Sequence, residues 1–344
     1  MRLPYLDFEP ALSEPAALAS SAVVAGRTSV GPGLVLGHCA TLRADGEAIR
    51  VGANGFFGAR ATVHIAEGAY ETIVGDDVTV GRFGLVHACT LGDGVLVGDA
   101  ATVMDGTVVG AHALIMPGAV VPPRKTLAGG TVYAGSPAAP VRSIARDELD
   151  RFHATLRGGA PLKADALVDL PPLQHPASAS GTAQPTRHPA TFVAPTAMLA
   201  GRVEMDEDSG VYFACVVDAG DARIALGKRT NVQDNSFLVT DARRGDLLIG
   251  DDVTIGHNVR MGSGAVGNRA LVGMGAIVGD RVVVEDGGCI GAGAHVEAGT
   301  RVPAGWIYAG RPARPFRELK PAERDGFANI IAIYAHYSAV YRAG

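Results

Sequence analysis

Aliphatic residues recur every six positions in two separate parts of the chain. The first series runs from residue 74 to residue 127, and only one of its steps, from Val86 to Leu91, is five residues long. The second series begins at Ile249, and its own five-residue step, from Met261 to Val266, falls at the same place in the series. A chance series of apolar residues would not reproduce both the six-residue period and the position of its single five-residue step. We interpret the series as two copies of one domain, with Ile249 of the second copy at the place of Val74 in the first.

A period of six matches neither the 3.6-residue repeat of a helix nor the two-residue alternation of a simple amphipathic strand. It fits a short strand followed by a tight corner, with one aliphatic side chain per strand pointing inward. Three such strands close a triangular coil of about 18 residues. The 46 glycines suit corners that need a positive φ angle. The sequence therefore predicts an all-β protein made of two tandem hexapeptide-repeat parallel β-helices.

A similar signature ends each copy, Tyr-Ala-Gly-x-Pro-Ala from Tyr133 and from Tyr308, and a helical pattern follows each time. The first helix is expected from about 146 to 157, and the second from about 321 to 342. A stretch rich in Pro, Ala, Gly and Ser separates the copies. The predicted organisation is a first domain at 1–157, a linker at 158–188 and a second domain at 189–344.

Composition excludes several classes of protein. A net charge of −5 argues against a general nucleic-acid binder, and 47% hydrophobic residues argue against wholesale disorder. No apolar run reaches the length of a membrane span. The acidic, proline-broken start is unlike a signal peptide, and the four cysteines form no CxxC motif. We therefore expect a cytoplasmic protein whose cysteines are buried and reduced.

Two strings in the second copy resemble the γ-class carbonic anhydrases. They are Thr-Asn-Val-Gln-Asp-Asn-Ser, which starts at Thr230, and Val-Thr-Ile-Gly-His, which ends at His257. The resemblance implies left-handed β-helical prisms packed as a trimer, with zinc bound by three histidines at each interface. One ligand ends the Asn-x-Gln-Asp strand, and two come from a Gly-His-(four residues)-His string. The middle ligand belongs to the neighbouring subunit.

The ligand positions carry over to this chain incompletely. The first copy has His64 and His87 at the outer positions but Arg82 at the middle one. The second copy has only the middle ligand, His257. Its two outer positions hold Val239 and Gly262. Because these losses are complementary, the resemblance implies one complete three-histidine site in which the first copy faces the second. Accidental decay of both copies is the alternative.

Four further residues match functional positions of the family. Gln233 corresponds to a glutamine near the metal-bound water, and the six-residue period predicts that it stacks with His257 on one face. Arg43 and Asp45, in Leu-Arg-Ala-Asp, match the family's Leu-Arg-Gly-Asp segment. Glu67 lies three residues after His64, where the family places an acidic proton-transfer residue.

The resemblance implies reversible hydration of carbon dioxide to bicarbonate, with zinc as the cofactor and iron or cobalt as possible substitutes. One alternative is a coenzyme A-dependent acyltransferase of the hexapeptide family, which needs a general base and no metal. The other is a metal-free, non-catalytic assembly subunit. Metal content separates the first hypothesis from both alternatives.

The expected partners are a small-molecule substrate and further copies of the same chain, with no nucleic acid and no membrane span. We expect a homo-oligomer with trimer-like packing of its β-helix domains. A ring of three domains cannot be filled by the two domains of one chain. To bring His64 to His257, a ring must contain both first and second domains, or one first domain must contact one second domain as a pair.

Overall fold

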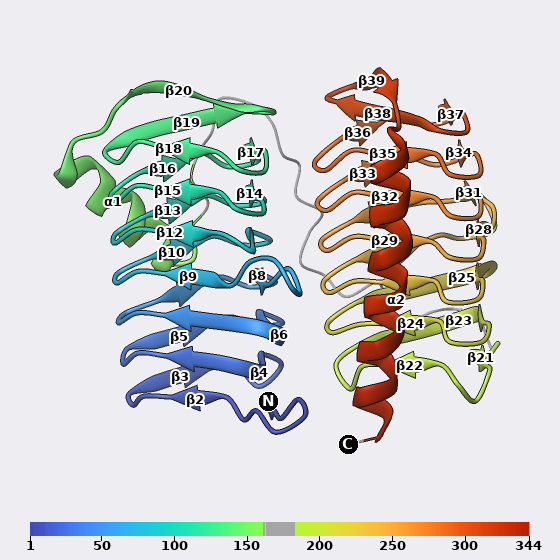
Figure 1. Ribbon diagram of the computed structural model, residues 1–344, viewed down its shortest axis with the longest axis horizontal. Coiled ribbons are helices and arrows are strands. Elements are labelled where there is room, and N and C mark those ends of the chain that lie inside the picture. Colours follow the sequence, from blue (N-terminus) through green and yellow to red (C-terminus); the bar gives the residue numbers. More distant parts are fainter. Residues whose placement is uncertain (161, 163–182, 344) are drawn as a thin grey trace. The chain divides into compact units, whose positions relative to one another are not determined.

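A computed structural model describes residues 1–160, 162 and 183–343 of the chain. The chain divides into two compact units, unit 1 at residues 1–170 and unit 2 at residues 171–344. Each unit is a left-handed β-solenoid with parallel sheets, followed by a helix (Figure 1). The fold predicted from the six-residue period and the family resemblance is thus confirmed. Most of the predicted linker, 158–188, lies outside the described residues, and the predicted domain boundaries stay a prediction.

In unit 1 the long strand β6 bends round a corner and contributes to two faces of the prism. Its start pairs with β8 and its end with β9. A separate sheet forms the third face. The sheet that contains β6 comprises β1 (Arg2–Leu3), β2 (Ala11–Leu12), β4 (Val23–Val30), β6 (Thr41–Val51), β8 (Thr62–His64), β9 (Thr72–Val74), β11 (Leu85–His87), β12 (Thr90–Leu91), β14 (Thr102–Val103), β15 (Val108–Val109), β17 (Val120–Val121) and β18 (Thr126–Leu127). The other comprises β3 (Ala16–Leu18), β5 (Leu34–Leu36), β7 (Phe56–Phe57), β10 (Thr79–Val80), β13 (Leu96–Val97), β16 (Leu114–Ile115), β19 (Thr131–Gly135) and β20 (Ala138–Ser143).

Unit 2 repeats this plan, with β25 in the place of β6. The sheet that contains β25 comprises β21 (Thr186–Arg187), β23 (Met198–Met205), β25 (Val216–Leu226), β27 (Phe237–Val239), β28 (Leu247–Ile249), β30 (Arg260–Met261), β31 (Gly264–Val266), β33 (Ile277–Val278), β34 (Val282–Val284), β36 (His295–Val296) and β37 (Arg301–Val302). The other comprises β22 (Phe192–Val193), β24 (Gly210–Val211), β26 (Asn231–Val232), β29 (Thr254–Ile255), β32 (Leu271–Val272), β35 (Cys289–Ile290), β38 (Trp306–Gly310) and β39 (Ala313–Glu318).

The periodic aliphatic residues form the core of each unit. Val97 pairs along its ladder with Val80 below and Ile115 above, and all three side chains are fully buried. Burial of such a side chain stabilises the fold by about 1.5–3 kcal/mol relative to exposure. Neighbouring coils approach so closely that a Cβ at Gly81 would lie 2.5 Å from Asp99 Oδ1. This is why small residues follow the aliphatic ones.

The helices differ more between the units than the prisms do. Helix α1 (Arg146–Arg157) is short, and its Leu149 and Leu156 pack on the outer side of β13, β16 and β19. Helix α2 (Pro321–Ala343) is almost twice as long and contacts β22, β24, β26 and β29 (Figure 1). Both helices lie where the sequence predicted them.

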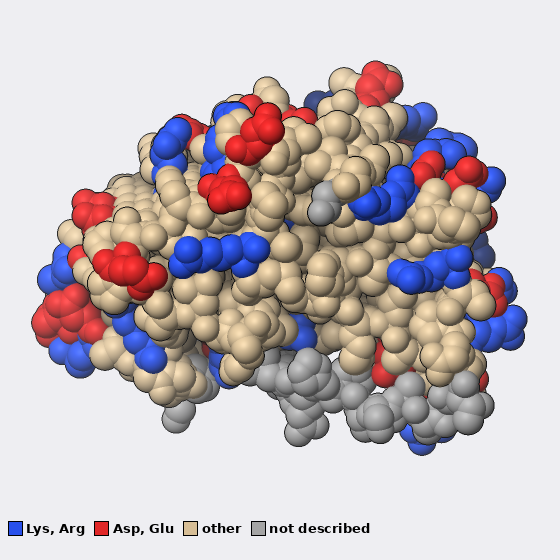
Figure 2. Space-filling view, turned by 90° about the horizontal axis from the view of Figure 1, so that it is seen from below, with Lys and Arg blue, Asp and Glu red and all other residues tan. Residues whose placement is uncertain are grey.

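No helix among the described residues is both long and apolar enough to cross a bilayer. None of the four cysteines is in a disulfide. On the face seen in Figure 2, basic and acidic side chains are interspersed between wide uncharged areas. The charges on that face therefore do not form one continuous basic surface over the described residues.

Candidate functional site

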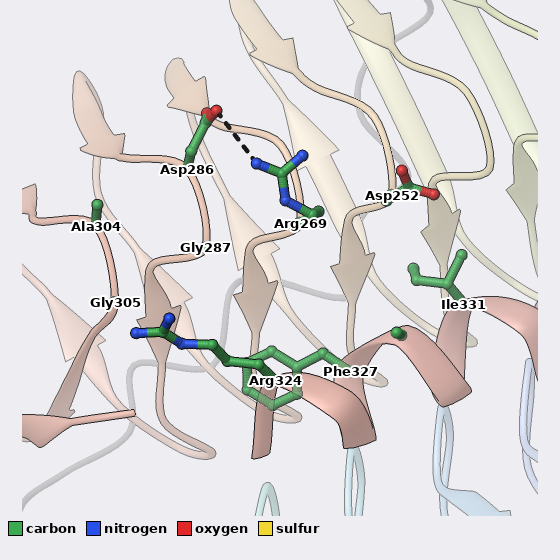
Figure 3. A pocket seen from close by; sticks show the side chains of 10 residues that line it. Asp252, Arg269, Asp286, Gly287, Ala304, Gly305, Arg324, Phe327 and Ile331 are labelled. Carbon is green, nitrogen blue, oxygen red and sulfur yellow. Dashed lines mark ion pairs between the residues drawn. The ribbon is translucent and has the colours of Figure 1, made fainter. Parts of the chain in front are cut away.

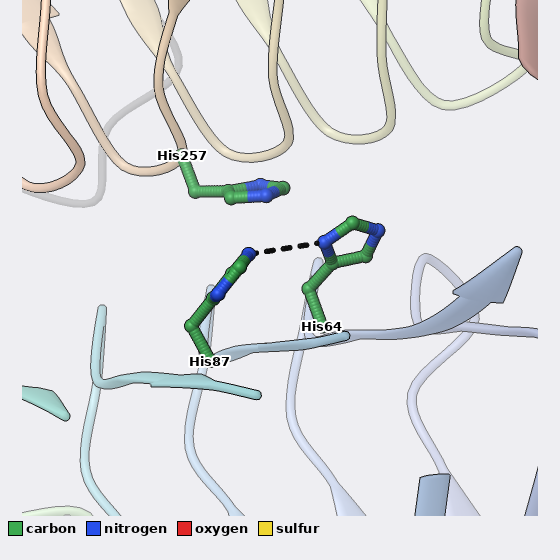
Figure 4. A group of neighbouring side chains, drawn as sticks. All are labelled: His64, His87 and His257. Carbon is green, nitrogen blue, oxygen red and sulfur yellow. Dashed lines mark hydrogen bonds between the residues drawn. The ribbon is translucent and has the colours of Figure 1, made fainter. Parts of the chain in front are cut away.

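His64 and His87 are direct neighbours in unit 1. Each is the last residue of its strand, and β8 and β11 pair in parallel with His64 opposite His87. The Nδ1 atom of His64 lies 3.3 Å from the Nε2 atom of His87 (Figure 4). The sheet register therefore brings together two imidazoles that are 23 residues apart in sequence.

Carboxylates lie beside the other nitrogen of each ring. His87 Nδ1 lies 2.7 Å from Asp105 Oδ1, and His64 Nε2 lies 3.6 Å from Asp45 Oδ2. Asp45 also forms a buried ion pair with Arg43, which stands opposite His64 in the sheet. A carboxylate that accepts one ring N–H leaves the lone pair on the other ring nitrogen. The Asp105 contact therefore places the lone pair of His87 on Nε2, the atom that faces His64 Nδ1.

This pair fits two ligands of a single metal ion. Zinc–imidazole bonds of about 2.0–2.1 Å at a tetrahedral angle place two ligand nitrogens about 3.3 Å apart. The observed separation of 3.3 Å has that value. Carboxylates on the outer nitrogens are the usual second layer of a zinc–histidine site, because they fix the tautomer and the ring orientation. The donor set of unit 1 thus suits zinc and would supply two of its ligands.

Arg82, at the place of the middle ligand in unit 1, is committed to an ion pair. Its Nε and one terminal nitrogen lie 3.0 and 2.5 Å from Asp99 Oδ2, and its backbone N–H donates to Asp99 Oδ1. Glu67 lies exposed in the turn after β8, with its side chain over Gly46. Burial raises the pKa of Tyr5 to about 12, and the nearby charge of Glu67 adds to the rise.

His257 occupies a corner of unit 2 between β29 and β30. Its Nδ1 lies 3.2 Å from Asp234 Oδ2, within a buried pair. Its Nε2 lies 3.3 Å from the hydroxyl of Tyr334 on α2. Asp234 therefore lies beside Nδ1 of this ring, on the side away from Nε2, which faces Tyr334.

Gln233 lies one position before the residue that stands opposite His257 in the sheet register. Val232 pairs with Ile255, so the residue two positions on, Asp234, faces His257, while Gln233 faces Gly256. The side-chain amide of Gln233 donates to Asn231 Oδ1 at 3.2 Å. The two predicted site residues thus share a corner of the prism, and the direct neighbour of the imidazole is the aspartate.

The two remaining ligand positions of unit 2 have been rebuilt without imidazoles. Val239 pairs with Asp218 in the sheet. At Gly262 a Cβ would lie 2.0 Å from Asp280 Oδ1 and 2.7 Å from a terminal nitrogen of Arg244. Arg244 pairs with Asp280 at 2.9–3.1 Å. The Arg244 guanidinium therefore fills the space that the missing imidazole would need.

Asp105, Asp234 and Tyr334 were not among the residues predicted for the site. Asp105 lies 18 residues after His87, one regular coil further along, so the six-residue period contained the signal. Asp234 was inside the motif that carried the family resemblance. Tyr334 belongs to the aromatic stripe of the second helix, and no local pattern relates it to a residue 77 positions earlier.

Comparison with known proteins places these features in a family. No family model matches the chain. Gamma carbonic anhydrase 1 of Arabidopsis thaliana, a mitochondrial protein, is 39% identical over 148 residues. That match covers 42% of this chain and 54% of the plant protein, so the chain spans about half the length of that relative.

Two further matches bear on the family and on the fold. Protein YrdA of Escherichia coli is 36% identical over 151 residues, which cover 42% of this chain and 82% of that protein. A solved structure of a putative acetyltransferase from Desulfovibrio desulfuricans has a TM-score of 0.55 over 99% of this chain and 80% of its own. It is only 13% identical, so it supports the fold alone. From the sequence relatives and the histidines at matched positions, we conclude that the chain belongs to the γ-class carbonic anhydrase family.

Proposed function

We propose that this protein catalyses the reversible hydration of carbon dioxide at one composite metal site. His64 and His87 of unit 1 supply two ligands, and His257 of unit 2 supplies the third. The observation that carries the proposal is the 3.3 Å separation of His64 Nδ1 and His87 Nε2, with Asp105 bonded to the far nitrogen of His87 and Asp45 near that of His64. The single imidazole of unit 2 lies 3.2 Å from Asp234.

A bound zinc ion would polarise a water molecule and lower its pKa from 15.7 to about 7. Asp105 and Asp234 would keep their imidazoles neutral at the coordinating nitrogen and fixed in direction. Arg43 would keep Asp45 ionised beside His64. The Gln233 amide would orient the substrate or product by hydrogen bonding, and the exposed Glu67 carboxylate would accept protons that leave the site. Iron or cobalt suits the same ligands, because imidazole binds all three metals.

Metal content tests this proposal directly. We expect purified protein to hold zinc, and His257→Ala to lower zinc affinity at least about 10-fold, since even loss of an outer partner costs about 10- to 100-fold. His64→Ala and His87→Ala should do the same, and hydration rates should fall in parallel. His295→Ala removes an exposed histidine of unit 2 and is the matched control. Full zinc retention in His257→Ala would reject the composite site.

Mixing two defective variants tests which units share the site. His64→Ala damages the unit 1 half and His257→Ala the unit 2 half. If the halves come from different chains, co-assembly of the two variants restores some zinc and some hydration activity. If they come from one chain, every mixed assembly stays defective. We propose a homo-oligomer with trimer-like packing, which light scattering tests independently.

The same measurements separate the alternatives. An acyltransferase would bind coenzyme A and need no metal, and an assembly subunit would show neither metal nor turnover. The acetyltransferase structure matched over nearly the whole chain is 13% identical and supports the fold alone, so it does not decide between these activities. We keep the reducing cytoplasm as the proposed compartment, which agrees with four cysteines outside any disulfide.

A further inference from the structure

A groove of about 480 Å³ lies in unit 2 between the prism and the first half of α2 (Figure 3). Corner residues of successive coils, including Arg269, Gly287 and Gly305, form one wall. Arg324 and Phe327 of α2 form the other. This volume falls in the range of small-molecule sites. None of the proposed metal ligands lines the groove, so it is independent of the proposed function.

Unit 1 carries two histidine side chains at the same place. His112 stands at the position that corresponds to Gly287 in the second copy, and its ring contacts Arg146 at 2.9 Å. His153 corresponds to Ala328, and it hydrogen-bonds Thr79 at 2.7 Å. Unit 2 thus carries glycine and alanine where unit 1 carries two imidazoles. The small side chains of Gly287 and Ala328 line the groove of unit 2.

Two arginines of unit 2 stand at positions where unit 1 has uncharged residues. Arg324 corresponds to the buried Leu149 of unit 1 and is exposed, and Arg269 corresponds to Gly94. Arg269 makes only a long contact of 3.9 Å with Asp286, and both side chains are more than half exposed. Ion pairs of this kind contribute little to stability. The guanidinium of Arg324 lies over Gly305, where a Cβ would come within 2.9 Å of it.

The floor of the groove is apolar. Ile331 is buried, and Phe327 packs against the cluster formed by Cys289 and Ile307. The other carboxylate in the lining, Asp252, is paired with Arg229 at 2.7 Å, outside the groove. The lining therefore combines two accessible guanidiniums with an aromatic and aliphatic floor.

We propose that this groove binds a small organic anion, with a carboxylate or phosphate group against the arginines and an apolar body on Phe327 and Ile331. Guanidinium groups recognise both kinds of anion through paired N–H donors. The apolar body gains free energy by leaving water. Neither the metal site nor the hydration reaction needs such a ligand.

The probes are benzoate and phenyl phosphate, titrated into the full-length protein. Phosphate alone and benzyl alcohol alone test the head group and the body separately. Trp306 is the single tryptophan, and it directly follows Gly305, so its fluorescence reports on the groove. We expect saturable binding of at least one aromatic anion and at least about 10-fold weaker binding of each fragment. The stronger of the two anions identifies the head group.

Variants that copy unit 1 give the decisive comparison. Gly287→His refills the groove, and the backbone tolerates it, because His112 adopts φ +59° where Gly287 has +64°. Ala328→His and Arg324→Leu introduce the unit 1 residues at the two other positions. Each should weaken binding at least about 10-fold, with the thermal midpoint unchanged. Arg243→Gln removes an exposed arginine outside the groove and should change nothing. Absence of saturable binding, or equal binding by wild type and Gly287→His, would overturn the proposal.

Discussion

The two units keep the same carboxylate but give it different partners. Asp105 in unit 1 holds His87, while Asp280, at the matching position of unit 2, holds Arg244. Both carboxylates are partly exposed, so each ion pair is expected to contribute no more than about 1 kcal/mol. The Arg244 guanidinium gives Asp280 a partner at the place where unit 2 has Gly262 instead of an imidazole.

The middle ligand position also differs between the units, but there the carboxylates are not at matched positions. Unit 1 has Arg82 paired with Asp99, and unit 2 has His257 paired with Asp234. Each unit thus has an ion pair where it lacks an imidazole and a carboxylate beside the imidazole that it carries. The proposed division of one site between the units would account for this pattern.

The largest expected effect concerns the core, where the units are alike. Ile115 and Ile290 occupy matched positions and are both fully buried. Ile115→Ala and Ile290→Ala should each lower the free energy of unfolding by about 2–5 kcal/mol, because each leaves a cavity between coils. Urea unfolding measures the loss. Val108→Ala, at an outward-facing position, should cost less than about 0.5 kcal/mol. A large effect in only one unit would show that the prisms are not equivalent.

The next largest effect should distinguish the two matched carboxylates, Asp105 and Asp280, by their influence on zinc binding. Asp105→Asn should weaken zinc binding about 10- to 100-fold, because His87 loses the acceptor that fixes its tautomer. Asp280→Asn should leave zinc affinity unchanged, since its partner is Arg244. Competition with a chelator measures both affinities. Equal loss in the two variants would contradict the division of the site.

Helix α2 gives a smaller effect, because its Tyr334 hydroxyl competes for the Nε2 lone pair of His257. Tyr334→Phe should therefore tighten zinc binding by about 2- to 5-fold, the equivalent of one modest hydrogen bond. The same chelator competition measures the change. Tyr341→Phe keeps the ring that stacks on Phe192 and serves as the control. Weaker zinc binding in Tyr334→Phe would show that the hydroxyl supports the site.

The smallest effect is a pH dependence confined to unit 1. Burial lowers the pKa of His153 below its usual 6.5. The unfolded chain therefore binds this proton first as pH falls, and the stability contributed above about pH 6.5 is lost below it. We expect the unfolding midpoint of unit 1 to fall between about pH 7.5 and about pH 5.5. His153→Gln should flatten this slope, whereas unit 2, with Ala328 at that position, should not show it.

Much of the fold was predictable because it is periodic. The aliphatic series indicated which side chains point inward, and Val97 and Ile115 are buried as expected. Both helices could be located from the apolar pattern after each Tyr-Ala-Gly-x-Pro-Ala signature. The candidate histidines came from the family resemblance, and the assembly that would unite all three stays a prediction.

The period failed where a coil departs from the regular spacing. His64 and His87 are 23 residues apart, because the turn that contains Glu67 lengthens the coil. Gln233 and His257 follow paired strands of one sheet, and the register makes Asp234 the residue opposite His257. Contacts across a coil depend on its length, which a local six-residue pattern does not contain.

By itself the sequence determined the solenoid fold and the uneven distribution of the matched histidines between the two copies. It also supported the interpretation that the chain contains two copies of one domain. Only the tertiary structure decided which carboxylates orient them, that Arg244 fills the space above Gly262, and that α2 brings Tyr334 to His257. The reason is physical. Inward-facing side chains repeat with the local backbone period, whereas side-chain partners are chosen across coils and along a packed helix, at sequence separations that no local period fixes.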